Sequence, residues 1–228
     1  GLVALAGMLA EYFGAIEGAS IDANKGAYSS AWMIIFAVIA AVMVLLGLYH
    51  IKMLPSTQVP ATGKKSTSEI MQDLVNVIGN FFTKKHIVYY IFFIILYRLA
   101  EGFIMKVAPL FLRASREVGG LGLSLTEIGT LNGVFGSAAF VIGSLLGGIF
   151  VARYGLKKTL FMLCCVFNLP FLAYTFLAVV QPTSLYLIGT CITMEYFGYG
   201  FGFVGLTLFM MQQIAPGKHQ MSHYAFAS

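Results

Sequence analysis

Long apolar segments alternate with short polar ones along most of the chain. About 20 apolar residues in a helix cross the hydrocarbon core of a bilayer. Five segments reach that length: residues 28–49, 86–112, 129–151, 159–180 and 185–211. Their apolar residues are continuous and do not alternate with polar ones, which favours helices over the strands of a membrane barrel. The pattern therefore predicts an all-α integral membrane protein with five full crossings and no sheet.

Two shorter apolar segments lie at the ends of the sequence. Residues 1–10 are uncharged but too short to cross, and residues 219–228 begin with a helical pattern and then stop. We expect both to be parts of membrane helices, so that the sequence is a partial chain of a longer bundle.

The one long polar stretch, residues 51–85, contains a helix of a different kind. Ser66 and Glu69 have the spacing of a capping box, which predicts a helix start. Apolar residues at helical spacing follow them: Ile70, Leu74, Val77, Ile78 and Phe81. We therefore expect an amphipathic helix that lies on the membrane surface.

Composition agrees with a membrane protein and argues against several other classes. Of the 228 residues, 59% are hydrophobic and 10% are charged, whereas a soluble domain carries about 25% charged residues. The histidines lie at helix ends and form no HExxH motif, no GxSxG motif is present, and no residues have metal-ligand spacing. No basic stripe with interleaved aromatic residues indicates nucleic-acid binding. We therefore expect no enzyme, no metal site and no nucleic-acid partner.

The net charge of +5 is distributed unevenly between two sets of alternate loops. One set has nine basic residues: Lys52, Lys64, Lys65, Lys84, Lys85, Arg153, Lys157, Lys158 and Lys218. The opposite set has three: Lys25, Arg113 and Arg116. Because basic residues concentrate in cytoplasmic loops, this split places residues 51–85 in the cytoplasm.

Four charged residues lie inside the predicted crossings and are the candidate site. Arg98, Glu101 and Lys106 are in one helix, and Glu195 is in another. Each such charge costs about 2.5 to 3.5 kcal/mol near the bilayer centre, so it should face a bundle interior or a wet cavity. The first three fall within an arc of roughly 140° of their helix. They are candidates for proton coupling or substrate binding, and the alternative is a structural charge cluster that joins helices.

Glycines and prolines within the crossings predict how the helices pack. Small residues four apart in sequence allow two helices to approach closely. Glycines are frequent in two of the predicted crossings. Residues 129–151 contain Gly129, Gly133, Gly136, Gly143 and Gly147, and residues 185–211 contain Gly198, Gly200, Gly202 and Gly205. Pro109 and Pro170 predict kinks, which act as gates in transporters or are static bends.

A short basic loop between two crossings resembles a known motif. The sequence GIFVARYGLKK, residues 148–158, is similar to the G-x-x-x-D-R-x-G-R-K loop of the major facilitator superfamily. It departs from that pattern at Ala152, where the family has Asp, and at Leu156, where the family has Arg. The resemblance implies a gating loop formed by Gly148, Arg153, Gly155, Lys157 and Lys158.

Three helical segments resemble one branch of that superfamily more closely. LYRLAEGFIMKVAPLFL, LTEIGTLNGVFG and TMEYFGYGFGFVGLTLFM are similar to the seventh, eighth and tenth helices of AmpG-type muropeptide permeases, and HQMSHYAFAS is similar to the start of the eleventh. The resemblance implies a major facilitator helical bundle in three parts. Residues 1–50 end the N-terminal six-helix half, residues 51–85 form the cytoplasmic linker, and residues 86–228 belong to the C-terminal half.

The resemblance also implies a function. Arg98 and Glu101 match a basic and acidic pair in the seventh helix of these permeases, and Glu195 matches an acid in the tenth, whereas Lys106 has no counterpart. The implied activity is proton-driven uptake of anhydromuropeptides across the inner membrane of a Gram-negative bacterium. We expect the protein to be a monomer that needs no cofactor. Its implied partners are the small-molecule solute, protons and the lipid bilayer. The alternatives are transport of another organic anion such as acetyl-coenzyme A, and a structural membrane subunit without transport.

The orientation can be tested by labelling. A cysteine at Lys64 should react with a membrane-impermeant maleimide only from the cytoplasmic side, and one at Ser115 only from outside, because the basic loops share one side. Whole cells and inverted vesicles would distinguish the two sides. The reverse pattern of labelling would invert the predicted orientation.

Overall fold

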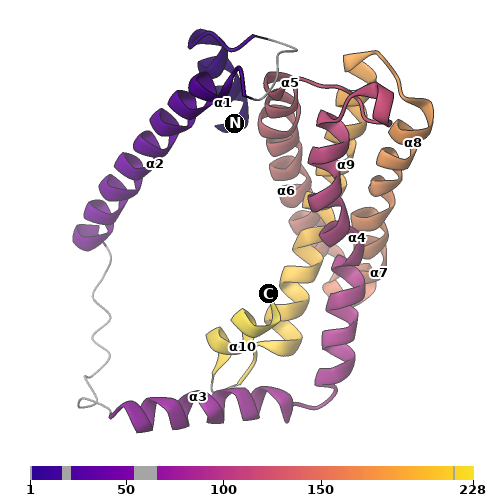
Figure 1. The fold of residues 1–228 in the computed structure, drawn as a ribbon. Helices are drawn as coiled ribbons and strands as arrows, with labels where there is room; N and C mark the ends of the chain where they lie inside the picture. Colours follow the sequence, from indigo (N-terminus) through magenta and orange to yellow (C-terminus); the bar gives the residue numbers. More distant parts are fainter. Residues whose placement is uncertain (1, 17–21, 54–65, 218) are drawn as a thin grey trace.

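The computed structural model describes residues 2–16, 22–53, 66–217 and 219–228, and these form helices and loops without a strand (Figure 1). The all-α prediction is therefore confirmed for this part of the chain. Residues 54–65 of the predicted linker, which include Lys64 and Lys65, lie outside the described residues, as does Lys218. The helices that begin and end without interruption are α1 (Leu2–Tyr12), α2 (Lys25–Met53), α3 (Thr67–Phe82), α4 (Ile87–Arg113) and α10 (Gln220–Ala227).

Three further crossings are built from joined segments. The first runs through α5 (Leu125–Thr130), the π-helical turn η2 (Leu131–Gly136) and α6 (Ser137–Tyr154). The second runs through α7 (Leu156–Asn168), the 3-10 turn η3 (Leu169–Phe171), which contains Pro170, and α8 (Leu172–Val180). The third runs through α9 (Leu185–Phe209) and the π-helical turn η4 (Met210–Ile214). A short 3-10 turn, η1 (Arg116–Val118), lies in the loop after α4.

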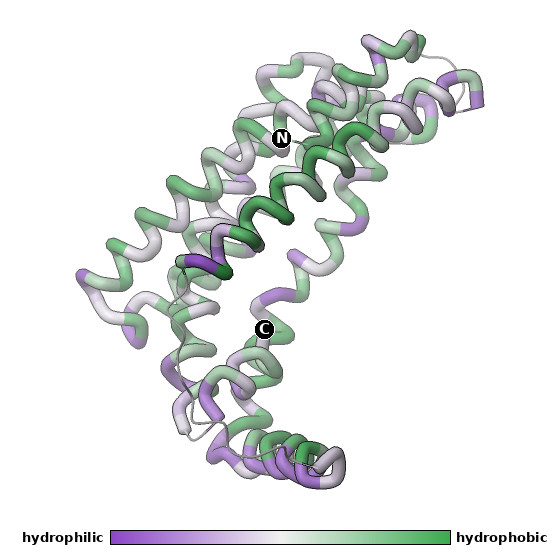
Figure 2. The backbone as a smooth tube through the Cα atoms, turned by 90° about the vertical axis from the view of Figure 1, so that its left-hand side faces the viewer, coloured by the Kyte–Doolittle hydropathy of each residue, from purple (hydrophilic) through white to green (hydrophobic). Residues whose placement is uncertain are grey.

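Four helical stretches of the described residues are long and apolar enough to cross a membrane: Lys25–Met53, Ile87–Arg113, Leu125–Tyr154 and Leu156–Val180. In Figure 2 these stretches are mainly green, and purple residues gather at helix ends and along α3. The fifth predicted crossing, α9, has 25 residues and is long enough. Its tyrosines, glycines and Glu195 make it less apolar than the other four. Four crossings are therefore confirmed by length and composition, and the crossing by α9 stays a prediction.

Helix α9 is the centre of the bundle. It packs against α6 on one side and α7 on another, while α1 packs against α5 at the end of the bundle where α2 begins (Figure 1). Tyr97, Leu163 and Leu206 belong to one buried apolar cluster, and Leu131 and Ile188 belong to a second. Most large side chains of α2 are exposed, as expected for a helix that faces lipid or other membrane helices.

Glycines allow α9 to touch its neighbours backbone to backbone. A Cβ atom at Gly143 would collide with the carbonyl oxygen of Phe197, and one at Gly200 would collide with that of Phe140. On another side of α9, a Cβ atom at Gly202 would collide with Phe167. The close approach predicted from glycine spacing is therefore confirmed on both sides of α9.

The amphipathic helix α3 crosses the lower ends of the spanning helices (Figure 1). Its predicted capping box is present, and the backbone N–H of Ser66 donates to Glu69 Oε2 at 2.8 Å. Phe81 is buried, and Lys84, just after the helix, donates from Nζ to the carbonyl oxygens of Ile214 and Pro216. These contacts attach α3 to the end of α9, while its position on a membrane surface stays a prediction.

The glycine contacts predict a difference in stability between two substitutions in α6. Gly143→Ala should lower the free energy of unfolding by about 1 to 3 kcal/mol, because the new methyl group would force two backbones apart. Gly148→Ala is the matched control, since a Cβ atom there would meet nothing within 4 Å. Thermal unfolding in detergent measures both. Equal melting temperatures would contradict the packing described here.

Candidate functional site

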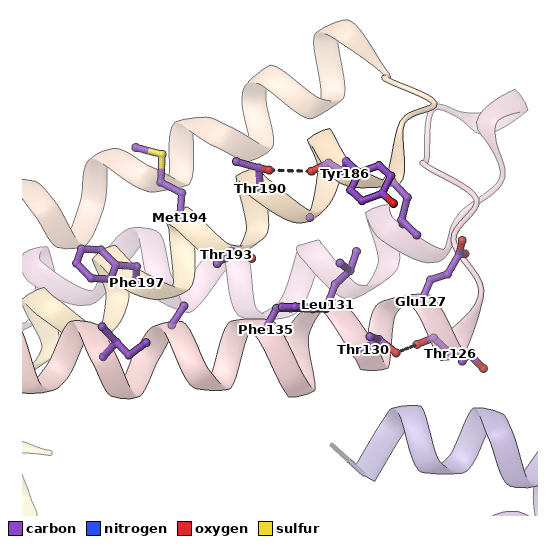
Figure 3. A pocket seen from close by; sticks show the side chains of 14 residues that line it. Thr126, Glu127, Thr130, Leu131, Phe135, Tyr186, Thr190, Thr193, Met194 and Phe197 are labelled. Atoms are coloured by element: carbon purple, nitrogen blue, oxygen red, sulfur yellow. Dashed lines mark hydrogen bonds between the residues drawn. The ribbon is translucent and has the colours of Figure 1, made fainter.

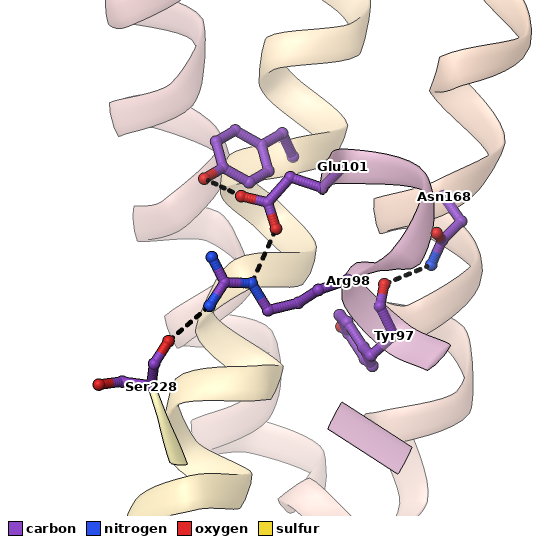
Figure 4. A network of polar contacts seen from close by, with 6 residues as sticks. Tyr97, Arg98, Glu101, Asn168 and Ser228 are labelled. Atoms are coloured by element: carbon purple, nitrogen blue, oxygen red, sulfur yellow. Dashed lines mark hydrogen bonds and ion pairs between the residues drawn. The ribbon is translucent and has the colours of Figure 1, made fainter. Parts of the chain in front are cut away.

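Two helices contribute an acidic side chain each to the interior of the bundle. On α4, Glu101 is buried and its Oε2 accepts a hydrogen bond and ion pair from Arg98 Nε at 3.0 Å (Figure 4). On α9, the hydroxyl of Tyr199 donates to Glu101 Oε1 at 2.9 Å. Both carboxylate oxygens of Glu101 are therefore paired, one within its own helix and one across to α9. Arg98 also donates from a terminal nitrogen to the carbonyl oxygen of Ser228 at 2.7 Å.

The neighbouring residue Tyr97 fixes the position of α4. Its hydroxyl donates to the carbonyl oxygen of Gly202 in α9 at 2.7 Å. Its own carbonyl oxygen accepts from Asn168 Nδ2 in α7 at 3.3 Å. Since Tyr97 is almost fully buried, these bonds form in an apolar environment where an unpaired polar group is costly. They hold Arg98 and Glu101 at a defined height relative to α7 and α9.

Glu195 lies on α9, one helical turn before Tyr199, and is 6% exposed. It lines a small cavity of about 40 Å³ together with Glu101, and its Oε2 has no hydrogen-bond partner. Among the described residues, Arg98 with Glu101 is the ion pair that reaches this cavity, and Glu195 takes no part in one. Burying an ionised carboxylate without a partner costs several kcal/mol. A carboxyl group at this position is therefore stabilised by binding a proton or a cation.

The structure brings three of the four predicted intramembrane residues together. Glu101 and Glu195 line one cavity, and Arg98 is attached to it through Glu101. Lys106 is exposed and does not line this cavity. Of the shared arc predicted for α4, only the part with Arg98 and Glu101 is therefore found at the site in the described residues.

The predicted gating loop is shorter in the structure than the sequence pattern indicates. Helix α6 ends at Tyr154 and α7 begins at Leu156, so that Gly155 alone forms the junction. Gly155 has φ +81° and ψ 142°, which is accessible almost only to glycine. The basic members of the loop are all exposed: Arg153, Lys157 and Lys158. Gly148 lies inside α6, about two turns before the junction.

The sequence reasoning did not single out several polar residues of the site. Asn132 lines the cavity with Glu101 and Glu195, and Tyr174, Tyr196 and Tyr199 surround it. An asparagine inside an apolar segment was a signal visible in the sequence. The tyrosines gave no such signal, because tyrosine is common in membrane helices without a polar role.

A larger groove of about 860 Å³ lies between the α5–η2–α6 helix and α9 (Figure 3). Of the described residues that line it, Glu127 alone is charged. The carboxylate of Glu127 already accepts from the backbone N–H and hydroxyl of Ser124 in a capping box. Thr130 and Thr190 likewise donate to carbonyl oxygens of their own helices. The groove is therefore apolar and separate from the paired acids.

The site combines the guanidinium of Arg98, which is paired with Glu101, with a second carboxyl group on Glu195 that has a different environment. Arg98 can bind an anionic ligand if a carboxylate of the ligand replaces that of Glu101. The two carboxylates have the same planar shape and can accept the same hydrogen bonds from the guanidinium. Glu195 has no basic partner among the residues that the structure describes. In the part of the chain that the structure describes, no group of three or more His, Cys, Asp or Glu side chains could hold a metal ion.

Comparisons with known proteins agree on a class of membrane proteins. A sequence model described as Major Facilitator Superfamily matches residues 1–228. The anhydromuropeptide permease of Escherichia coli (strain K12) is 27% identical over 131 residues, which are 58% of this chain and 26% of that protein. A Rickettsia conorii protein named transporter AmpG 4 is 25% identical over 224 residues, 97% of this chain and 50% of that protein. The chain thus spans half or less of the length of these relatives, and no solved structure matches it significantly.

The bond from Tyr199 to Glu101 can be tested by stability. Tyr199→Phe should lower the free energy of unfolding by about 1 to 3 kcal/mol, because it leaves a buried carboxylate oxygen without its donor. Tyr186→Phe on the same helix is the control, since Tyr186 is 91% exposed. Thermal unfolding of the two variants in detergent would measure the difference. A loss of equal size in both would contradict the pairing.

Proposed function

Since the chain belongs to the Major Facilitator Superfamily, a family of membrane transporters, we propose that it is part of a proton-coupled transporter for anhydromuropeptides in a bacterial inner membrane. The proposed solute is taken from the name of the Escherichia coli relative. The proposal that transport is coupled to protons is based on the chemistry of the two buried acids, Glu101 and Glu195. Both steps go beyond family membership and are tested separately below.

One observation carries the proposal. Glu101 from α4 and Glu195 from α9 line the same small cavity inside the bundle. Among the described residues, Glu101 has a basic partner and Glu195 has none. In a low-dielectric site, two nearby carboxyl groups cannot both remain ionised without a large cost. A site of this kind binds one proton readily and releases it when the surroundings change.

The Arg98–Glu101 pair supports coupling between proton and solute. Arg98 is 38% exposed, so a solute can approach its guanidinium without first separating the helices. An anionic group that binds Arg98 competes with Glu101 for the same donors. Glu101, once displaced, becomes more stable as the protonated acid, so binding of an anion and of a proton favour one another. Muropeptides carry carboxylate groups, which suit this partner.

The remaining predicted site residues have more peripheral roles in this proposal. Lys106 is exposed on α4 and offers a second positive charge to an anionic solute. The basic residues of the gating loop, Arg153, Lys157 and Lys158, flank the Gly155 junction. Together with Gly148 they remain the gating loop that the resemblance implies.

The coupling role is tested by neutralising each acid in the complete transporter. Glu101→Gln and Glu195→Gln should reduce accumulation of radiolabelled anhydromuropeptide to the level of vesicles without protein, because an amide cannot carry the proton. The measurement uses reconstituted vesicles with an imposed proton gradient. Glu117→Gln, in an exposed loop, is the control and should accumulate solute normally.

Solute exchange without a gradient separates coupling from folding. Glu195→Gln should still exchange labelled for unlabelled anhydromuropeptide, since that process moves no net proton. If both variants accumulated the solute with unchanged pH dependence, the acids would be structural. If the unchanged protein transported no anhydromuropeptide, the proposed solute would be wrong.

A further inference from the structure

The contact between the amphipathic helix α3 and the short helix α10 contains a buried histidine. His223 of α10 is 2% exposed, and it meets α3 at the last turn, where Phe81 is the buried residue of that helix. Histidine is the side chain that ordinarily changes its charge between pH 5 and 8. A buried histidine between two helices can therefore make their contact depend on pH.

One ring nitrogen of His223 joins the two helices by a hydrogen bond. Its Nε2 lies 3.2 Å from the carbonyl oxygen of Val77 in α3. A carbonyl oxygen is only an acceptor, so Nε2 carries the hydrogen and donates it. The same ring packs against Phe81, with 5.7 Å between the ring centroids. The attachment of α3 to α10 thus uses one polar and one apolar contact of a single side chain.

The other ring nitrogen, Nδ1, is buried and has no hydrogen-bond partner among the described residues. In a neutral ring that carries its hydrogen on Nε2, Nδ1 has no hydrogen and requires no acceptor. A second proton would place an N–H group and a positive charge at Nδ1, where neither an acceptor nor water reaches it. Burying an uncompensated charge costs much more free energy than burying the neutral ring. The attached state therefore favours neutral His223.

Two groups lie near enough to act on the ring through their charge, Lys84 and His219. Lys84 stays at the contact because its ammonium group donates to the carbonyl oxygens of Ile214 and Pro216. The ring of His219 lies one helical turn before His223, with 5.9 Å between the centroids. Both groups repel a positive charge on His223 when they are themselves protonated.

The other described elements around α10 do not supply an acid that accepts from Nδ1. On α3, Asp73 lies one turn before Val77, but Nδ1 has no partner in this part of the chain. The turn η4, which packs against α10, has only apolar and uncharged polar side chains. From α4, the positively charged Arg98 contacts the far end of α10 at the carbonyl oxygen of Ser228.

We propose that His223 is a pH-sensitive attachment point, at which the neutral ring joins α3 to α10 and protonation of the ring releases α3. A histidine in water has a pKa of about 6.5. The attachment therefore has its full stability above about pH 6.5 and loses stability as the pH falls below that value. Because one proton is bound on release, the ratio of attached to released protein falls by at most about tenfold for each pH unit.

The switch goes beyond the proposed function and depends on neither the solute nor the two buried acids. It lies where α3 crosses the ends of the spanning helices (Figure 1), at the end of the bundle that the basic loops predict to be cytoplasmic. Acidification on that side would separate α3 from α10, while Lys84 would still join the end of α3 to the end of η4.

Hydrogen–deuterium exchange of the complete protein in lipid nanodiscs tests the switch. Exchange of the α3 amides is measured by mass spectrometry between pH 5 and 8 and corrected for the known effect of pH on the intrinsic rate. Even rare release of α3 raises the exchange rate. We expect constant protection between pH 7 and 8, and protection roughly 10- to 30-fold lower at pH 5.

Two variants show whether His223 is responsible. In His223→Gln the side-chain amide can donate to the carbonyl oxygen of Val77 but cannot bind a proton in this pH range. Its α3 helix should therefore remain protected at pH 5. His219→Gln is the matched control, since it removes the neighbouring histidine and should retain most of the loss of protection at low pH.

Equal protection of α3 at pH 5 and pH 7.5 in the unchanged protein would overturn the proposal, as would an equal loss in His223→Gln. If its melting temperature shows that His223→Gln does not fold, His223→Phe replaces it. That variant keeps a ring against Phe81 and should show lower protection that does not vary with pH. These results are independent of transport, so failure of the proposed solute or of proton coupling would leave them unchanged.

Discussion

The energetic cost of a charge inside a membrane is the constraint on which the arrangement of this bundle depends. Arg98 and Glu101 lie in the middle of α4, and each is tolerable there only with a partner or a wet surface. The structure supplies Arg98 Nε at 3.0 Å and the Tyr199 hydroxyl at 2.9 Å as partners of Glu101. Tyr199 belongs to α9. The charge on α4 is therefore tolerated only if α9 packs beside α4 and is rotated so that Tyr199 reaches Glu101.

Close packing of α9 makes this partnership possible. Its glycines let α6 approach on one side and α7 on another until backbones touch. A helix seated so tightly has little freedom to rotate, and its polar residues are therefore fixed in direction. Glu195 is held inside the bundle, where its Oε2 has no hydrogen-bond partner in the described part of the chain, because turning it outward would break the glycine contacts. The same packing that stabilises the bundle thus maintains a costly acid in its interior.

Sequence reasoning predicted the features that depend on neighbours along the chain. The apolar segments, the capping box at Ser66 and Glu69, and the close approach through Gly143 and Gly200 all follow from local spacing. Local rules failed for features that depend on which helices meet. The π-helical turns cannot be read from sequence, since they reflect packing around them. Tyr199 had no distinguishing signal, because its role arises only from a carboxylate on another helix.

The sequence by itself determined that this is an all-helical membrane protein and that Arg98, Glu101 and Glu195 cannot face lipid. Both conclusions follow from the free energy of transferring peptide groups and charges into hydrocarbon, which depends on residue type and segment length. Only the tertiary structure decided that Glu101 is paired while Glu195 has no ion pair among the described residues. It also decided that Lys106 does not line the cavity of the two acids and that Asn132 does. These outcomes depend on the rotation and height of each helix against its neighbours, which are set by side-chain contacts between residues distant in sequence.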